Sequence, residues 1–185
     1  DDMSSSMQKK FGNVPTFGCT TSGEIVSGQM LNNSVVAMAM NSRIIEDLDI
    51  QILPNISKEP KEAVAKAFQA FENKFGQPMA EMDFQKYVGI VLIDGLQGAE
   101  ENIMEKIGDL TNVTFIGGSA GDDLKFVKTH VFSEGKAYSN AVLLILIKAA
   151  TAFDFIKTQS FTVINKSLIA TKVDTAKREV LEFNN

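Results

Sequence analysis

Two short loops rich in glycine and hydroxyl side chains are the first candidates for chemistry in this sequence. Their members are Gly18, Cys19, Thr20 and Thr21 in the first loop, and Gly117, Gly118, Ser119, Ala120, Gly121 and Asp122 in the second. Glycine lets a ligand approach the backbone closely, and exposed amides favour anions or carboxylates. We therefore expect two ligand-contacting loops, unless the glycines only permit tight turns. Neither loop has the lysine of a P-loop or the three-glycine spacing of a dinucleotide site.

Three single residues add alternatives. Asp94 ends an apolar run, where it either accepts a hydrogen bond from a ligand or simply turns the chain with Gly95. Cys19 is the only cysteine, and it is either a nucleophile or a small side chain that the loop requires. His130 is the only histidine, and it is either a haem or metal ligand or an ordinary surface or strand-edge residue.

The composition excludes several classes of protein. One cysteine and one histidine exclude a disulfide framework and a cysteine-rich or histidine-based metal cluster, and they argue against a Ser/His/Asp triad. A net charge of −5 argues against a nucleic-acid partner. The longest apolar run, residues 141–147, is far below the roughly 20 residues of a membrane span. We expect a cytoplasmic protein without a membrane or metal partner.

The elements that must position these residues are those of a mixed fold. We expect helices over residues 57–75, capped by Ser57 and ended by Gly76, and over residues 98–110. Strands are expected over residues 34–40, 87–93, 113–116, 124–132 and 141–147, with a turn at 133–136. The run at 87–93 is typical of a strand that is covered on both faces. The fold class predicted is α+β (α/β mixed), a mixed β-sheet core with flanking helices.

The sequence also contains a weak internal repeat. Residues 14–24 can be aligned with residues 113–123, which matches Gly18 with Gly117 and Thr20 with Ser119. Each copy follows a segment of helical character and precedes an apolar run. We therefore expect two related halves.

Three motifs in a fixed order resemble the FIST domain family. They are residues 14–24, the stretch from Asp94 to Glu101, and residues 115–123. The tail, residues 171–184, looks like the opening strands of the family's C-terminal module. The resemblance implies an N-terminal sensor module at residues 1–150 and an incomplete start of the C-terminal module at 151–185. Strands near 153–161 and within 168–183 are expected to pair with each other or in a homodimer.

The resemblance implies a sensor of signal transduction rather than an enzyme. Its ligand would be an amino acid or a similar small metabolite, and its output partner a protein such as a kinase or cyclase. Some relatives bind haem and report nitric oxide through a histidine, but His130 does not match that ligand residue by residue. A hydrolase that uses Cys19 or Thr20 with Asp94 is the remaining alternative, although it lacks an identifiable base.

Overall fold

The computed structural model describes residues 2–177 and 179–184. The chain divides into two compact units, residues 1–153 and residues 154–185, which are described separately. Arg178, part of the tail that resembles a FIST C-terminal module, lies outside the described residues.

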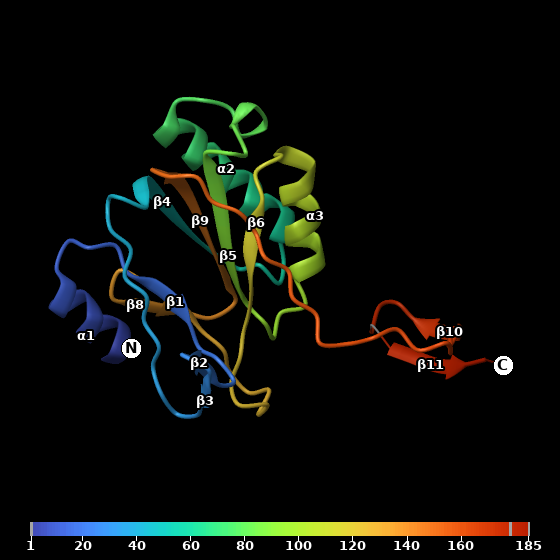
Figure 1. Ribbon diagram of the computed structural model, residues 1–185. Coiled ribbons are helices and arrows are strands. Elements are labelled where there is room, and N and C mark those ends of the chain that lie inside the picture. The colour runs from blue at the N-terminus through green and yellow to red at the C-terminus, as the bar shows by residue number, and fades with distance from the viewer. Residues whose placement is uncertain (1, 178, 185) are drawn as a thin grey trace. The chain divides into compact units, whose positions relative to one another are not determined.

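The first unit is built on a four-stranded sheet in the order β4-β9-β5-β6 (Figure 1). Strands β4 (Ile45–Pro54) and β5 (Tyr87–Asp94) flank β9 (Ala141–Ala149), and both pair with it antiparallel. Strand β6 (Phe115–Ala120) joins the far side of β5 in parallel, following a crossover through a helix. The sheet is therefore mixed, which confirms the α+β class.

Two helices cover one face of this sheet (Figure 1). Helix α2 (Pro60–Phe75) buries Val64, Phe68 and Phe71, which recur at helical spacing, and α3 (Glu100–Leu110) buries Ile103 and Ile107. A 3-10 turn, η1 (Met79–Glu81), follows α2 and buries Met79 in the same core.

The ends of α2 confirm one expected cap and correct the other. Gly76 adopts a left-handed conformation with φ 70°, and its amide donates to the Glu72 carbonyl, so it ends the helix as predicted. Ser57 is not the N-cap. The helix begins instead at Pro60 after Glu59, because proline has a fixed φ and needs no amide partner in the first turn.

A smaller layer lies on the opposite face of the sheet. Strands β1 (Phe17–Cys19), β7 (Val131–Ser133) and β8 (Lys136–Tyr138) form a three-stranded sheet in that order. Helix α1 (Asp2–Phe11) lies beside it (Figure 1), where Thr16 Oγ1 donates to Gln8 Oε1 at 2.9 Å. A separate hairpin of β2 (Glu24–Val26) and β3 (Gln29–Leu31) follows β1.

Covering both faces explains the continuous apolar runs of the central strands. Along β9, Val142, Leu144 and Leu146 pack into the helical core, whereas Leu143 and Ile145 pack toward the small sheet. Strand β5 alternates in the same way, as predicted for residues 87–93.

Three expected strands are wrong. Residues 34–40 form no strand, because no neighbouring strand pairs with their backbone. Residues 124–130 form a loop, and only Val131 and Phe132 of the predicted strand lie in β7, because the Asp122 carboxylate binds the amides of residues 126–128. Residues 153–161 likewise form no strand, since no strand lies against them in the described chain.

The hairpin turn at residues 133–136 is confirmed, but it joins β7 to β8. Its central residues, Glu134 and Gly135, both have positive φ, as a tight hairpin with right-handed twist requires. The two copies of the internal repeat lie in different sheets, β1 antiparallel to β7 and β6 parallel to β5. The duplication therefore stays a prediction.

The second unit consists of one antiparallel hairpin within its described residues. Strand β10 (Ala170–Asp174) pairs with β11 (Glu179–Phe183), and nearly all of their described side chains are exposed. Dimerisation through these strands also stays a prediction.

Candidate functional site

A large cavity lies over the second face of the four-stranded sheet, within the first unit. Its volume is about 960 Å³, and its floor includes Ile45 and Leu48 of β4 and Ile90 and Leu92 of β5. Its walls are formed by helix α1, by strand β1 with the residues directly after it, by residues 33–40, and by the loop around residues 121–128. The cavity is therefore built from segments that are far apart in the sequence.

The first predicted loop lines this cavity throughout. Gly18, Cys19, Thr20 and Thr21 all contribute to the wall. Thr20 is bound by two hydrogen bonds to His130, the residue directly before β7. The Thr20 amide donates to the His130 carbonyl at 2.9 Å, and the His130 amide donates to Thr20 Oγ1 at 3.0 Å. The loop is thus an extension of the β1–β7 ladder.

Gly18 cannot carry a side chain without moving an aromatic ring. A Cβ at this position would lie 2.5 Å from Cζ of Phe132, which also lines the cavity. The glycine therefore lets the Phe132 ring lie directly against the backbone of β1.

The second loop reaches the cavity only at its end. Gly121 and Asp122 line it, together with the neighbouring Asp123. The Gly121 amide donates to the Thr20 carbonyl at 2.9 Å, and a Cβ on Gly121 would lie 2.9 Å from the Ser22 amide nitrogen. The structure therefore brings the two predicted loops into contact at Gly121.

The other predicted residues of the second loop lie in β6 and do not line the cavity. They are Gly117, Gly118, Ser119 and Ala120. Gly117 passes so close to the Val91 backbone that a side chain has no space. Ser119 Oγ instead donates to Glu100 Oε1 at 2.9 Å, at the start of α3. The other carboxylate oxygen, Glu100 Oε2, is buried and has no hydrogen-bond partner among the described residues.

Asp122 organises the loop that follows it. Its carboxylate accepts hydrogen bonds from the amides of Phe126 at 2.9 Å, Val127 at 2.6 Å and Lys128 at 3.0 Å. The amides of Lys128 and Val127 hold the pKa of the Asp122 carboxyl below its ordinary value, since they stabilise the charged form. Its carboxylate is thus occupied by its own loop.

Asp94 does not line the cavity. Its carboxylate is 1% exposed and accepts hydrogen bonds from the Asn140 amide at 2.5 Å, the Leu96 amide at 3.2 Å, Gln97 Nε2 at 3.3 Å and Thr129 Oγ1. It therefore ties the end of β5 to both ends of the β7–β8 hairpin.

His130 and Cys19, the residues considered for haem ligation and for hydrolysis, lie in different settings. The ring of His130 does not line the cavity, and its Nδ1 lies 3.0 Å from Ser139 Oγ. Burial raises the pKa of the Cys19 thiol, which opposes formation of the thiolate that a nucleophile requires. The described residues contain no group of three or more His, Cys, Asp or Glu that could hold a metal ion.

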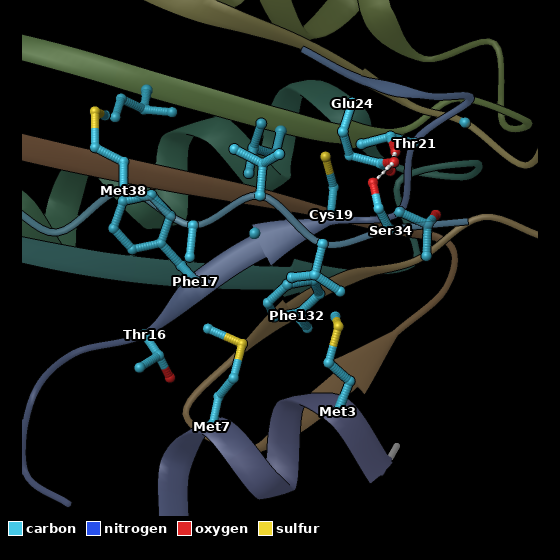
Figure 2. Close-up of a pocket in the computed structure, with 18 of the residues that line it drawn as sticks. Met3, Met7, Thr16, Phe17, Cys19, Thr21, Glu24, Ser34, Met38 and Phe132 are labelled. Carbon is cyan, nitrogen blue, oxygen red and sulfur yellow. Dashed lines mark hydrogen bonds between the residues drawn. The ribbon is translucent and has the colours of Figure 1, made fainter. Parts of the chain in front are cut away.

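Sequence reasoning missed two parts of the cavity. Glu24 accepts hydrogen bonds from Ser34 Oγ at 2.6 Å and Thr21 Oγ1 at 2.5 Å, and these bonds lower the pKa of its carboxyl (Figure 2). Met3 and Met7 project from α1 toward the cavity (Figure 2). Their spacing of four residues on a helix was the available signal.

Comparison with known proteins supplies the family. A scan against family models matches the FIST N domain over residues 1–185, the whole chain. The chain belongs to the FIST family. FIST domains are small-ligand-binding sensory domains of signalling proteins rather than catalytic domains. No curated protein and no solved structure matches this FIST domain. None of its described helices is both long enough and apolar enough to cross a bilayer.

Proposed function

We propose that this FIST domain senses a small metabolite that binds in the cavity beside the two glycine loops. The supporting observation is the contact at Gly121, which gives one cavity a wall from each predicted loop. An amino acid is the simplest candidate for the group held by the loops. The two loops meet at one polar end of the cavity, which is lined by Thr21 and Gly121 together with the carboxylates of Glu24 and Asp122.

The domain would report occupancy to a downstream protein such as a kinase or cyclase. The cavity contacts α1, the 33–40 segment and the loop after β6, so a ligand has several surface segments to reorder. A ligand shifts such an equilibrium only by its difference in affinity between the two arrangements.

A thermal-shift screen of the full chain tests the sensing function. A panel of amino acids and small metabolites should contain compounds that raise the midpoint, since ligand at 100 times its Kd adds about 2.7 kcal/mol to the free energy of unfolding. Thr21→Ala should weaken the effect of any hit, because it removes a hydroxyl from the cavity wall. Thr151→Ala, an exposed threonine outside the cavity, is the matched control. Equal weakening by both variants would contradict this placement of the ligand.

A further inference from the structure

The cavity is apolar over most of its wall. Side chains of α1, β1, β7 and the 33–40 segment face it, among them Met3, Met7, Phe11, Phe17, Met38 and Phe132. Figure 2 shows Met3 and Met7 on α1 and Met38 on another wall, with Phe17 and Phe132 also at the cavity. Methionine is flexible and polarizable, so it packs well against chains and rings of different shape.

The size of the cavity favours a ligand larger than a free amino acid. Its volume of about 960 Å³ is near the upper end of the roughly 300–1,000 Å³ that is usual for sites holding drug-sized ligands. A small zwitterion would leave most of this apolar wall without contact.

The carboxylates of the wall already have partners within the chain. Glu24 accepts two hydroxyl hydrogen bonds, Asp122 accepts three amide hydrogen bonds, and Asp123 pairs with Lys125 at 3.8 Å. These contacts satisfy the carboxylates without a ligand ammonium group. The carboxylates therefore offer little to a ligand ammonium group, and most of the remaining wall is apolar.

One wall of the cavity is an unpaired segment with exposed apolar side chains. Residues 34–40 run along the cavity without strand pairing, and Val35, Val36 and Met38 are exposed. A long apolar ligand would cover these side chains and remove them from water, which is favourable in proportion to the area buried.

We infer that the ligand of this cavity is an amphipathic molecule whose long apolar chain or fused ring makes most of the contact, with a single polar head near Thr21 and Gly121. This inference rests on the proposed function, because it assumes that the cavity is the ligand site. It differs in assigning affinity to the apolar body rather than to the head.

A series of neutral n-alkanols from hexanol to dodecanol tests the inference on the full chain. Each alkanol is titrated against N-phenyl-1-naphthylamine, a neutral apolar probe whose fluorescence rises in an apolar site. The affinity should increase about fourfold for each added methylene, as expected for transfer of the chain out of water. An affinity that does not change with chain length would overturn the inference.

Cys19 locates the binding without a variant. It is the only cysteine of the chain and lines the cavity, so dodecanol should slow its modification by N-ethylmaleimide at least tenfold. Met7→Lys should weaken dodecanol binding tenfold or more by placing an ammonium group in the apolar wall. Met104→Lys, on the exposed side of α3, should leave it unchanged. Binding without protection of Cys19 would place the alkanols elsewhere and overturn the inference.

Two measurements on both panels of compounds, the protection of Cys19 and the thermal midpoint, separate failure of the inference from failure of the proposed function. If amino acids protect Cys19 and raise the thermal midpoint while alkanols do neither, the apolar ligand class is wrong but the sensing cavity stands. If no member of either panel protects Cys19 or shifts the midpoint, the cavity is not the ligand site and both proposals fail.

Discussion

Asp94 shows how a residue that the sequence marks as a candidate ligand contact can instead join the elements around the site. Its carboxylate links the loop after β5 to Thr129 and Asn140, on either side of the β7–β8 hairpin. That hairpin carries the Phe132 ring, and His130, the residue before it, fixes Thr20 through its backbone. The shape of the cavity therefore depends on a carboxylate that does not line it.

Replacing Asp94 tests this dependence. Asp94→Ala should lower the free energy of unfolding by about 2–4 kcal/mol, because it leaves the half-buried Asn140 amide and the buried Thr129 hydroxyl without an acceptor. Urea denaturation measures the change. Asp109→Ala, at an exposed aspartate of α3, should change it by less than about 0.5 kcal/mol. If Asp94→Ala lowered the free energy of unfolding no more than Asp109→Ala does, the hydrogen bonds of Asp94 would contribute little to stability.

Asp122 leads to a prediction about pH. Its folded pKa lies below the ordinary value of 3.8, so the hydrogen bonds to residues 126–128 are fully present above that pH. They should be lost as the pH falls through the lowered pKa, when the carboxyl takes up a proton. In an NMR titration, the amide resonances of Phe126, Val127 and Lys128 should move together, with a midpoint below pH 3.8.

Two neutral substitutions provide the comparison for this titration. Asp122→Asn should remove the transition from the three amides. Asp123→Asn should preserve it, because that carboxylate pairs with Lys125 rather than with the amides, and asparagine tolerates its φ of 56°. A midpoint at or above pH 3.8 in the wild-type protein would contradict the assignment.

At the scale of elements, the 34–40 segment is the clearest departure from the sequence pattern. Its apolar, β-branched residues predict a strand, but a strand also needs an edge with which to pair. Helix spacing and buried runs were sufficient for α2, α3, β5 and β9, since each contributes to a core by itself. They were insufficient where a polar side chain, such as that of Asp122, binds the backbone amides that a strand would use.

Proline substitution distinguishes an unpaired segment from a strand. Val36→Pro should change the free energy of unfolding by less than about 1 kcal/mol, because no ladder hydrogen bond is lost at this position. Val91→Pro, in the centre of β5, should cost about 3 kcal/mol or more. Chemical denaturation compares the two variants. A large loss in Val36→Pro would mean that residues 34–40 pair as a strand in solution.

The candidate site could be predicted in part. The glycine and hydroxyl pattern identified the first loop and the end of the second, because close backbone approach demands such residues at Gly18 and Gly121. It could not separate Gly121 from Gly117, since both positions exclude a side chain for different reasons. The contribution of α1 to the cavity wall could not be predicted either. An amphipathic helix has the same sequence pattern whether its apolar face packs on a core or borders a cavity.

At the scale of the whole molecule, the two units differ in how much core they contain. Both buried clusters lie entirely within residues 1–153, whereas the described part of the second unit contains one exposed hairpin. An isolated two-stranded hairpin is at best marginally stable in water. The stability of the chain should therefore reside in the first unit.

Removal of the second unit tests this expectation. A chain that ends at Phe153 should unfold with a free energy within about 1 kcal/mol of the full chain, since no buried cluster is touched. Its binding of N-phenyl-1-naphthylamine should also be retained, because every residue of the cavity wall is kept. A chain that failed to fold after this truncation would contradict the division into units.

The position of β9 at the centre of the sheet has a consequence for synthesis on the ribosome. Ile45 at the start of β4 pairs with Ala149 at the end of β9. After β4 is synthesised, about 100 further residues must therefore be added before its partner strand is complete. At about 5–20 residues per second, this wait lasts roughly 5–20 s. During that time the apolar face of β4 is open to chaperones and to other nascent chains, and the yield of folded protein in the cell depends on which of them meets it first.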